Sequence, residues 1–86
     1  MPNSIIIIYG TSWCGDCLRT RRVLEKRDIE YQWINIDRDK QAEQFVLEHN
    51  KGMRSVPTII FPDGSMLVEP KFSQLVDKLT ALGLTA

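Results

Sequence analysis

The regular alternation of strand-like and helix-like segments is the feature that most constrains what this chain can fold into. Residues 5–9 are four isoleucines followed by a tyrosine, a pattern typical of a strand buried on both faces. A Gly-Thr-Ser segment interrupts this run, and a helix is predicted from residue 14 or 15 to residue 27. The apolar positions of that helix recur at helical spacing and are Cys17, Thr20 and Leu24. Residues 31–36 then alternate bulky side chains, which predicts a second strand.

A second helix and a hairpin are predicted in the middle of the chain. Asp37 is the expected N-cap of the helix, and residues 50–52, Asn-Lys-Gly, are expected to end it. Its apolar stripe comprises Ala42, Phe45, Val46 and His49. Residues 58–61 predict a third strand, and residues 65–68 predict the strand that returns beside it. The Pro-Asp-Gly segment between them favours a turn, because proline presets φ and glycine accepts a positive φ.

The C-terminal segment predicts a last helix. Pro70 is expected to open it at its first turn, and Gly83 to stop it. The expected apolar stripe comprises Phe72, Leu75, Val76, Leu79 and Leu82. The order is therefore β-α-β-α-β-β-α, an α/β fold with a four-stranded mixed sheet flanked by helices. The first two strands should be parallel with a right-handed crossover, and the last two antiparallel. A chain of 86 residues predicts a single domain over residues 1–86.

Composition narrows the classes of partner and the compartment. Lys and Arg total 11, as do Asp and Glu, so the formal net charge is zero and the pI is near 6.5. Overall charge therefore does not favour nucleic acid or an anionic membrane as a partner. The apolar run at residues 5–8 is too short for a signal peptide, and no basic stretch precedes it, so a cytoplasmic protein is expected. Two cysteines in a reducing compartment indicate chemistry or metal binding rather than a structural disulfide.

The segment Cys14-Gly15-Asp16-Cys17 carries the strongest chemical signal. It lies where the first predicted strand ends and the first helix begins. The N-terminus of a helix offers free N–H donors and the positive end of its dipole, which favour a thiolate. The thiolate is the species that attacks in disulfide exchange. We therefore predict Cys14 as the nucleophile and Cys17, one turn further on, as the more buried resolving thiol.

Two other interpretations of the cysteine pair stand beside the redox one. A structural zinc site needs four ligands, and outside the pair the chain offers His49 and carboxylates. His49 falls on an apolar stripe, which favours a core or capping role, so a metal or iron–sulfur site would have to be shared between two chains. Alternatively, the cysteines are two small buried apolar residues without chemistry, although their strand-to-helix placement argues against this.

The neighbours of the pair suggest several roles. The carboxylate of Asp16 disfavours a second negative charge on a nearby thiol, or accepts a proton from Cys17, or simply complements the helix dipole. Trp13 is predicted to shield the thiolate or to dock a substrate, or instead to be buried in the core. Three arginines either offset the charge of Asp16, attract an acidic thiol ligand or form a solvated face: Arg19, Arg21 and Arg22. Tyr31 and Trp33 are interpreted as strand packing.

Taken together, the pattern resembles the glutaredoxin–thioredoxin superfamily over the whole chain, and most closely the mycoredoxins. The matching stretches are Thr11-Ser12-Trp13-Cys14, Cys17-Leu18-Arg19, Arg54-Ser55-Val56-Pro57-Thr58 and Asp63-Gly64-Ser65. The resemblance implies a thioredoxin-like fold and a cis peptide between Val56 and Pro57 that faces the cysteines. It also implies that the Val56 backbone pairs with bound substrate, with Arg54 and Ser55 beside it.

The resemblance also defines the expected reaction and its alternatives. It implies reduction of protein mixed disulfides by a low-molecular-weight thiol as co-substrate, without a tightly bound cofactor and in a monomer. The candidate co-substrates are mycothiol, bacillithiol and glutathione. Glutathione-binding relatives carry a glycine pair and an acidic residue where this chain has Val68-Glu69-Pro70-Lys71, which suits a different small thiol such as mycothiol. One alternative is a thioredoxin-like donor recycled by a flavoprotein reductase, and another is a metal or iron–sulfur carrier. The tryptophan segment typical of the redoxins that serve ribonucleotide reductase is absent.

Overall fold

The computed structural model describes residues 5–84, and its elements follow the predicted order. The strands are β1 (Ile6–Gly10), β2 (Tyr31–Asn35), β3 (Thr58–Ile60) and β4 (Met66–Val68). The helices are α1 (Gly15–Lys26), α2 (Lys40–His49) and α3 (Phe72–Ala81). Each predicted helix and strand is therefore present, with ends that differ by one or a few residues.

The strands form one mixed sheet in the order β2-β1-β3-β4. β1 and β2 are parallel, with Ile8 opposite Trp33, which confirms the expectation from their helical connection. β3 runs antiparallel to both β1 and β4, with Ile59 opposite Ile8 on one side and opposite Leu67 on the other. Gly64 in the connecting turn has a φ of 87°, and its N–H donates to the Phe61 carbonyl, so the predicted hairpin is confirmed.

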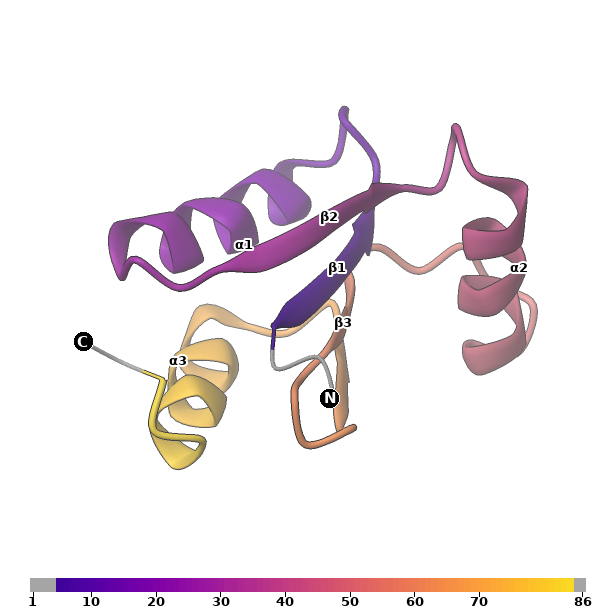
Figure 1. Cartoon of the computed structure of the whole chain (residues 1–86). Coiled ribbons are helices and arrows are strands. Elements are labelled where there is room, and N and C mark those ends of the chain that lie inside the picture. The colour runs from indigo at the N-terminus through magenta and orange to yellow at the C-terminus, as the bar shows by residue number, and fades with distance from the viewer. Residues whose placement is uncertain (1–4, 85–86) are drawn as a thin grey trace.

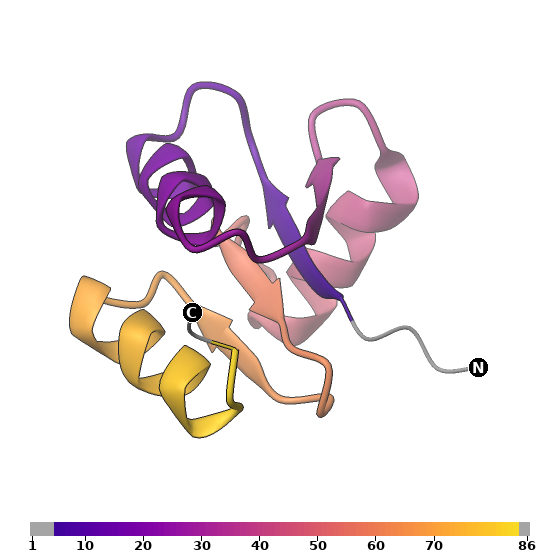
Figure 2. The same ribbon diagram turned by 60° about the vertical axis from the view of Figure 1, so that its left-hand side comes forward.

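The helices cover both faces of the sheet (Figure 1). α1 and α3 lie on one face and α2 lies on the other, as Figure 2 shows. The larger buried cluster joins the first face to these two helices and comprises Ile6, Ile8, Leu24, Ile59, Phe61, Leu75 and Leu79. The second cluster lies under α2 and comprises Ile36, Ala42 and Val46. Within residues 5–84, no helix has the length and apolar character needed to cross a lipid bilayer.

The N-cap of α2 differs from the prediction. Asp39 rather than Asp37 caps the helix, and its carboxylate accepts a hydrogen bond from the Ala42 N–H at 3.0 Å. The reason is a turn at the end of β2, in which the Asn35 side chain accepts from the Asp37 N–H at 2.9 Å. This turn delays the helix by two residues and leaves the Asp37 carboxylate free for other partners.

The start of α3 also differs from the prediction. Pro70 precedes the N-cap, Lys71, instead of opening the helix. The Gln74 side chain accepts a hydrogen bond from the Lys71 N–H at 2.8 Å, which fixes the helix start after the proline. Phe72 was predicted on the buried stripe, but as the first residue of α3 it is 65% exposed. The stripe residues Leu75 and Leu79 are buried as predicted.

Candidate active site

Cys14 and Cys17 lie at the junction of β1 and α1, where the sequence predicted them. Cys14 is the N-cap of α1, and its sulfur accepts a hydrogen bond from the Cys17 N–H at 3.1 Å. Both cysteines are free thiols. Cys14 is half-buried, whereas Cys17 is completely buried. The sulfur of Cys14 is therefore the more accessible of the two, and a backbone N–H already donates to it.

Cys17 sits in a closely packed environment. Burial raises the pKa of its thiol to about 12, and its hydrogen bond with Cys14 adds to the shift. A backbone hydrogen bond from Thr11 and the charge of Arg21 lower that pKa, but they do not outweigh burial. A Cβ atom on Gly10 would lie only 2.7 Å from the Cys17 sulfur, so the end of β1 contacts this cysteine directly. Cys17 is therefore a neutral thiol at neutral pH.

The peptide between Val56 and Pro57 is cis, as the resemblance implied, and it faces the cysteine pair. The Cys14 thiol donates to the Val56 carbonyl oxygen at 3.8 Å. Pro57 is buried, and its carbonyl accepts from the Glu69 N–H at 2.9 Å. The Val56 N–H has no hydrogen-bond partner among residues 5–84. The residue whose carbonyl oxygen receives the Cys14 thiol therefore also has a free backbone donor. Ser55 directly precedes Val56, and its carbonyl oxygen accepts from the Thr58 hydroxyl at 2.7 Å.

Trp13 is 69% exposed, so its predicted alternative position in the core is wrong. Its indole N–H donates to Asp37 at 2.9 Å, and the other oxygen of Asp37 accepts from Arg54 at 2.5 Å. The Arg54 side chain also donates to Glu43 at 2.7 Å. The hydrogen bond from Arg54 and then that from Trp13 hold the pKa of the Asp37 carboxyl below its usual value. Through these hydrogen bonds, the Trp13–Asp37–Arg54 network connects the segment before Cys14 to the segment before Val56.

Arg54, which the resemblance implied beside the substrate, belongs to this network. Its guanidinium is already occupied by two carboxylates, which raise its pKa. Its Nε and one of its Nη atoms are engaged in this way, and Asp37 links it to Trp13.

The charged residues of α1 have three different environments. Arg19 forms an ion pair with Asp16, so it offsets the charge of that carboxylate, and Asp16 makes no hydrogen bond with Cys17. The Arg21 guanidinium carbon lies 4.3 Å from the centroid of the Trp33 ring, and its side chain donates to the Tyr31 hydroxyl at 3.1 Å. Tyr31 and Trp33 therefore pack against the helix as strand residues, as interpreted. Arg22 is exposed.

His49 was predicted in a core or a capping role; it is exposed at the end of α2, so the core position is wrong, and its contact with a helix carbonyl agrees with a capping role. Its Nδ1 lies 2.9 Å from the Phe45 carbonyl oxygen, and its ring packs 4.1 Å from the ring of Phe45. Over the described part of the chain, no three His, Cys, Asp or Glu side chains are grouped in a way that could hold a metal ion.

Comparison with known proteins places this geometry in a family. The sequence profile of the glutaredoxin family matches residues 6–66. The chain belongs to the glutaredoxin family. It is a thiol–disulfide oxidoreductase with a Cys-x-x-Cys pair, and the family uses a low-molecular-weight thiol as co-substrate.

Several relatives match over nearly the full chain. A protein of Mycobacterium tuberculosis, which its name assigns provisionally to the glutaredoxins, is 39% identical over 82 residues, covering 95% of this chain and 98% of the relative. Mycoredoxin 1 of Corynebacterium glutamicum is 34% identical over 79 residues, covering 92% and 98%. The structure of the glutaredoxin-like NrdH-redoxin of Escherichia coli superposes with a TM-score of 0.70 and 26% identity, covering 84% of this chain and 91% of that one. The predicted superfamily and fold are confirmed.

Sequence reasoning missed three contributors to this glutaredoxin site. Asp37 was interpreted only as a helix cap, although Asp39 fills that role. The signal was the presence of two aspartates near one helix start, because only one of them can be the cap. Gly10 was interpreted only as a break after the strand, although a glycine next to a cysteine-bearing loop is a signal of close approach. Glu43, on α2, gave no signal in the sequence.

Proposed function

We propose that this glutaredoxin reduces mixed disulfides between proteins and a low-molecular-weight thiol of the mycothiol type. Cys14 is the proposed nucleophile, and the observation that carries this role is its place as the N-cap of α1. There its sulfur accepts the Cys17 N–H at 3.1 Å and stays accessible, while Cys17 is buried. The similarity to Mycoredoxin 1 supports the choice of thiol. So does the sequence Val-Glu-Pro-Lys at residues 68–71, which lacks a glycine pair.

The proposed reaction consists of two disulfide exchanges. The Cys14 thiolate attacks the small-thiol sulfur of the mixed disulfide, the protein sulfur leaves as a thiolate, and it takes up a proton. Cys14 now carries the small thiol in a disulfide. The thiolate of a second small thiol attacks the sulfur of the bound small thiol, which releases their shared disulfide and restores the Cys14 thiolate. The net result is one protein thiol and one oxidised small-thiol dimer for each mixed disulfide consumed.

Val56 is proposed to align the substrate backbone. Its N–H has no partner among residues 5–84, and its carbonyl oxygen receives only the thiol of Cys14. An extended substrate segment can pair with these two groups in the manner of a short added strand. Trp13 and the side chains of Asp16, Arg54 and Ser55 are proposed to border the bound segment.

Cys17 is proposed as the resolving thiol of a slower, dithiol route. With a pKa of about 12 it is a weak nucleophile while Cys14 is a free thiol or thiolate. Once Cys14 carries a small thiol, its own negative charge no longer opposes the ionisation of Cys17, and an internal disulfide can form. Because this route starts from a buried neutral thiol, the monothiol route is proposed to carry most turnovers.

Single-cysteine variants and a choice of reductants test the proposal. Cys14→Ser should abolish reduction of a protein–mycothiol mixed disulfide, and Cys17→Ser should preserve it. The oxidised protein is then offered mycothiol, bacillithiol, glutathione, or thioredoxin reductase with NADPH, and its reduction is followed by tryptophan fluorescence. Rapid reduction by mycothiol and not by the reductase supports the proposal. Full turnover by Cys14→Ser would show that the nucleophile is wrongly assigned.

A thioredoxin-like electron donor is the second candidate. It is favoured by the similarity to the NrdH-redoxin, whose structure was described in terms of a thioredoxin-like activity profile. In this case the reductase alone would reduce the oxidised protein, and Cys17→Ser would lose activity together with Cys14→Ser.

A further inference from the structure

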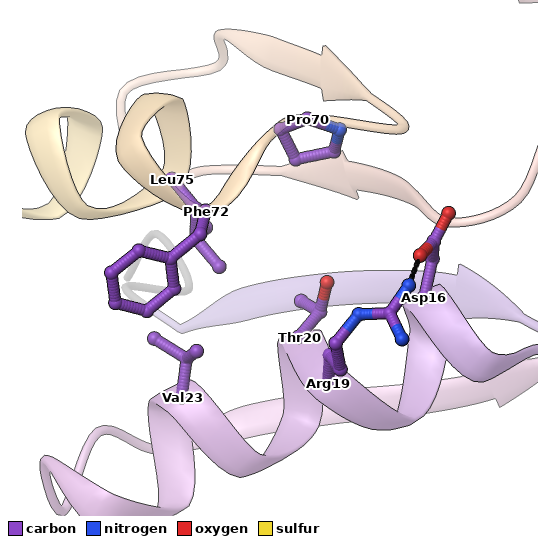
Figure 3. Close-up of a pocket in the computed structure, with 7 residues that line it drawn as sticks. All are labelled: Asp16, Arg19, Thr20, Val23, Pro70, Phe72 and Leu75. Carbon is purple, nitrogen blue, oxygen red and sulfur yellow. Dashed lines mark ion pairs between the residues drawn. The ribbon is translucent and has the colours of Figure 1, made fainter.

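A groove runs along α1 on the side that faces α3. Its wider part has a volume of about 400 Å³, within the range typical of ligand sites, and is lined by Arg19, Arg22, Val23, Lys26, Arg27 and Phe72. It continues toward the start of α1 as a smaller hollow of about 60 Å³ that Asp16, Thr20 and Pro70 also line. Figure 3 shows this narrow end, with Phe72 from α3 facing Val23 from α1. The groove therefore begins two residues from Cys14.

The wider part of the groove is strongly basic in a chain with no net charge. Four of its lining side chains are cationic and none of those described is acidic. Arg19 is paired with Asp16, and Arg27 donates to the Val23 carbonyl oxygen at 3.3 Å. The side chains of Arg22 and Lys26 make no hydrogen bond or ion pair with any residue in the range 5–84. Two unneutralised cations therefore face one groove.

The groove also has an apolar part. Phe72 leaves 65% of its surface exposed, although it belongs to a helix whose other large apolar residues pack against the core. Its ring faces Val23 across the groove (Figure 3). An exposed phenyl ring among cations offers an apolar contact to a ligand that also carries negative charge.

We propose that this groove docks an acidic segment of the protein substrate, with one large apolar side chain packed on Phe72. The inference rests on the proposed function, because it places the disulfide of that substrate at Cys14. Charge complementarity with Arg22 and Lys26 selects the acidic segment, and Phe72 selects the apolar residue.

Distance along α1 favours a protein segment over a small thiol. With a helical rise of 1.5 Å per residue, Arg19 lies about 8 Å and Arg27 about 20 Å beyond Cys14 along the axis. A small thiol bonded to Cys14 reaches only the near end of this span. An extended chain advances about 3.3 Å per residue, so the docked residues lie about two to six positions from the substrate cysteine.

Peptides that differ only in charge test the docking. Each peptide contains one cysteine in a mixed disulfide with mycothiol. Two to six positions after this cysteine, the acidic peptide carries Asp, Glu and Leu, the basic peptide carries Lys, Arg and Leu, and the neutral peptide carries Ser, Gln and Leu. The acidic peptide should have the highest kcat/KM, and its advantage should shrink as salt is added. Reversing the charge of both Arg22 and Lys26 (R22E/K26E) should lower its kcat/KM about tenfold and raise that of the basic peptide. Phe72→Ser should remove the benefit of Leu for the acidic peptide.

The matched control is K40E/K51E, which makes the same charge change at exposed positions on and just after α2, on the other face of the sheet. This control should leave the preference for the acidic peptide intact. All variants should reduce hydroxyethyl disulfide, which is small and neutral, at the rate of the parent protein.

Two further results separate failure of the docking from failure of the proposed function. Equal kcat/KM for all three peptides would refute the docking and leave the disulfide chemistry standing. If no peptide is reduced, binding of fluorescent cysteine-to-serine peptides still decides the matter, because docking requires no reaction. Equal affinity for a peptide and for an oligonucleotide of the same charge would refute selection of a protein segment.

Discussion

Replacing Gly10 with alanine should destabilise the protein, because β1 ends where two side chains leave no room for a Cβ atom. That atom would lie 2.7 Å from the Cys17 sulfur and 2.7 Å from the nearest carbon of the Trp33 ring. Optimal separations between such atoms are about 3.5–4.0 Å, so each contact is too short by about 1 Å. Cys17 is completely buried, and Trp33 is held under the Arg21 guanidinium, so neither can move freely.

The expected loss is about 1–3 kcal/mol of unfolding free energy, the usual range for overpacking in a core. For a domain of this size each kcal/mol corresponds to about 4–8 °C in Tm. Urea and thermal unfolding of the reduced protein, followed by circular dichroism, measure both quantities. The matched control is Gly15→Ala, where the nearest atom to the new Cβ is 3.8 Å away on the flexible Arg19 side chain. This control should be neutral or slightly stabilising.

A double-mutant cycle isolates the contact with sulfur. Cys17→Ala removes the sulfur, so Gly10→Ala should cost less in that background than in the parent protein, by about 0.5 kcal/mol or more. Gly10→Ala that leaves the stability of the parent unchanged would refute the close packing at the end of β1. Equal costs in both backgrounds would place the clash on Trp33 alone.

Three other outcomes are expected. The pKa of Cys17 is about 12 in the folded protein and 9.0 for an exposed thiol, so the unfolded state loses this proton first. Raising the pH from 9 to 12 should therefore destabilise the parent more than Cys17→Ala, as urea unfolding at several pH values would show. Asp37→Ala should free the indole of Trp13. In a Trp33→Phe background, the fluorescence anisotropy of the Asp37→Ala protein should therefore be lower than that of the protein with Asp37 intact. The buried hydroxyl of Thr11 has no hydrogen-bond partner among residues 5–84, so Thr11→Val should stabilise the protein by about 1 kcal/mol, and a loss in thermal unfolding would contradict this.

Local patterns predicted the helices and strands well, because each segment of this chain shows a single hydrophobic pattern, either that of a strand or that of a helix. The buried positions Cys17, Thr20 and Leu24 of α1 were all predicted from spacing alone. The cysteine pair was placed correctly for the same reason, since a clear strand pattern precedes it and a clear helical pattern follows it.

The errors concern choices between neighbouring residues that compete for one role. Asp37 and Asp39 are both good caps, and the side chain of Asn35 decided between them. Phe72 fits the apolar stripe by spacing, but at the first position of α3 it lies beyond the packed core. The network of Trp13, Asp37 and Arg54 joins segments that are 17 to 41 positions apart in the chain, so no local pattern could have shown it.

The unequal burial of the two cysteines has a consequence for regiochemistry. Since Cys17 is sealed from solvent and Cys14 is not, any external thiol that opens an internal disulfide between them must bond to Cys14 and release Cys17. Every covalent intermediate therefore has the same connectivity, whichever direction the electrons flow. In the parent protein, mass spectrometry after a brief reaction with an oxidised small thiol should accordingly find the adduct on Cys14 and none on Cys17.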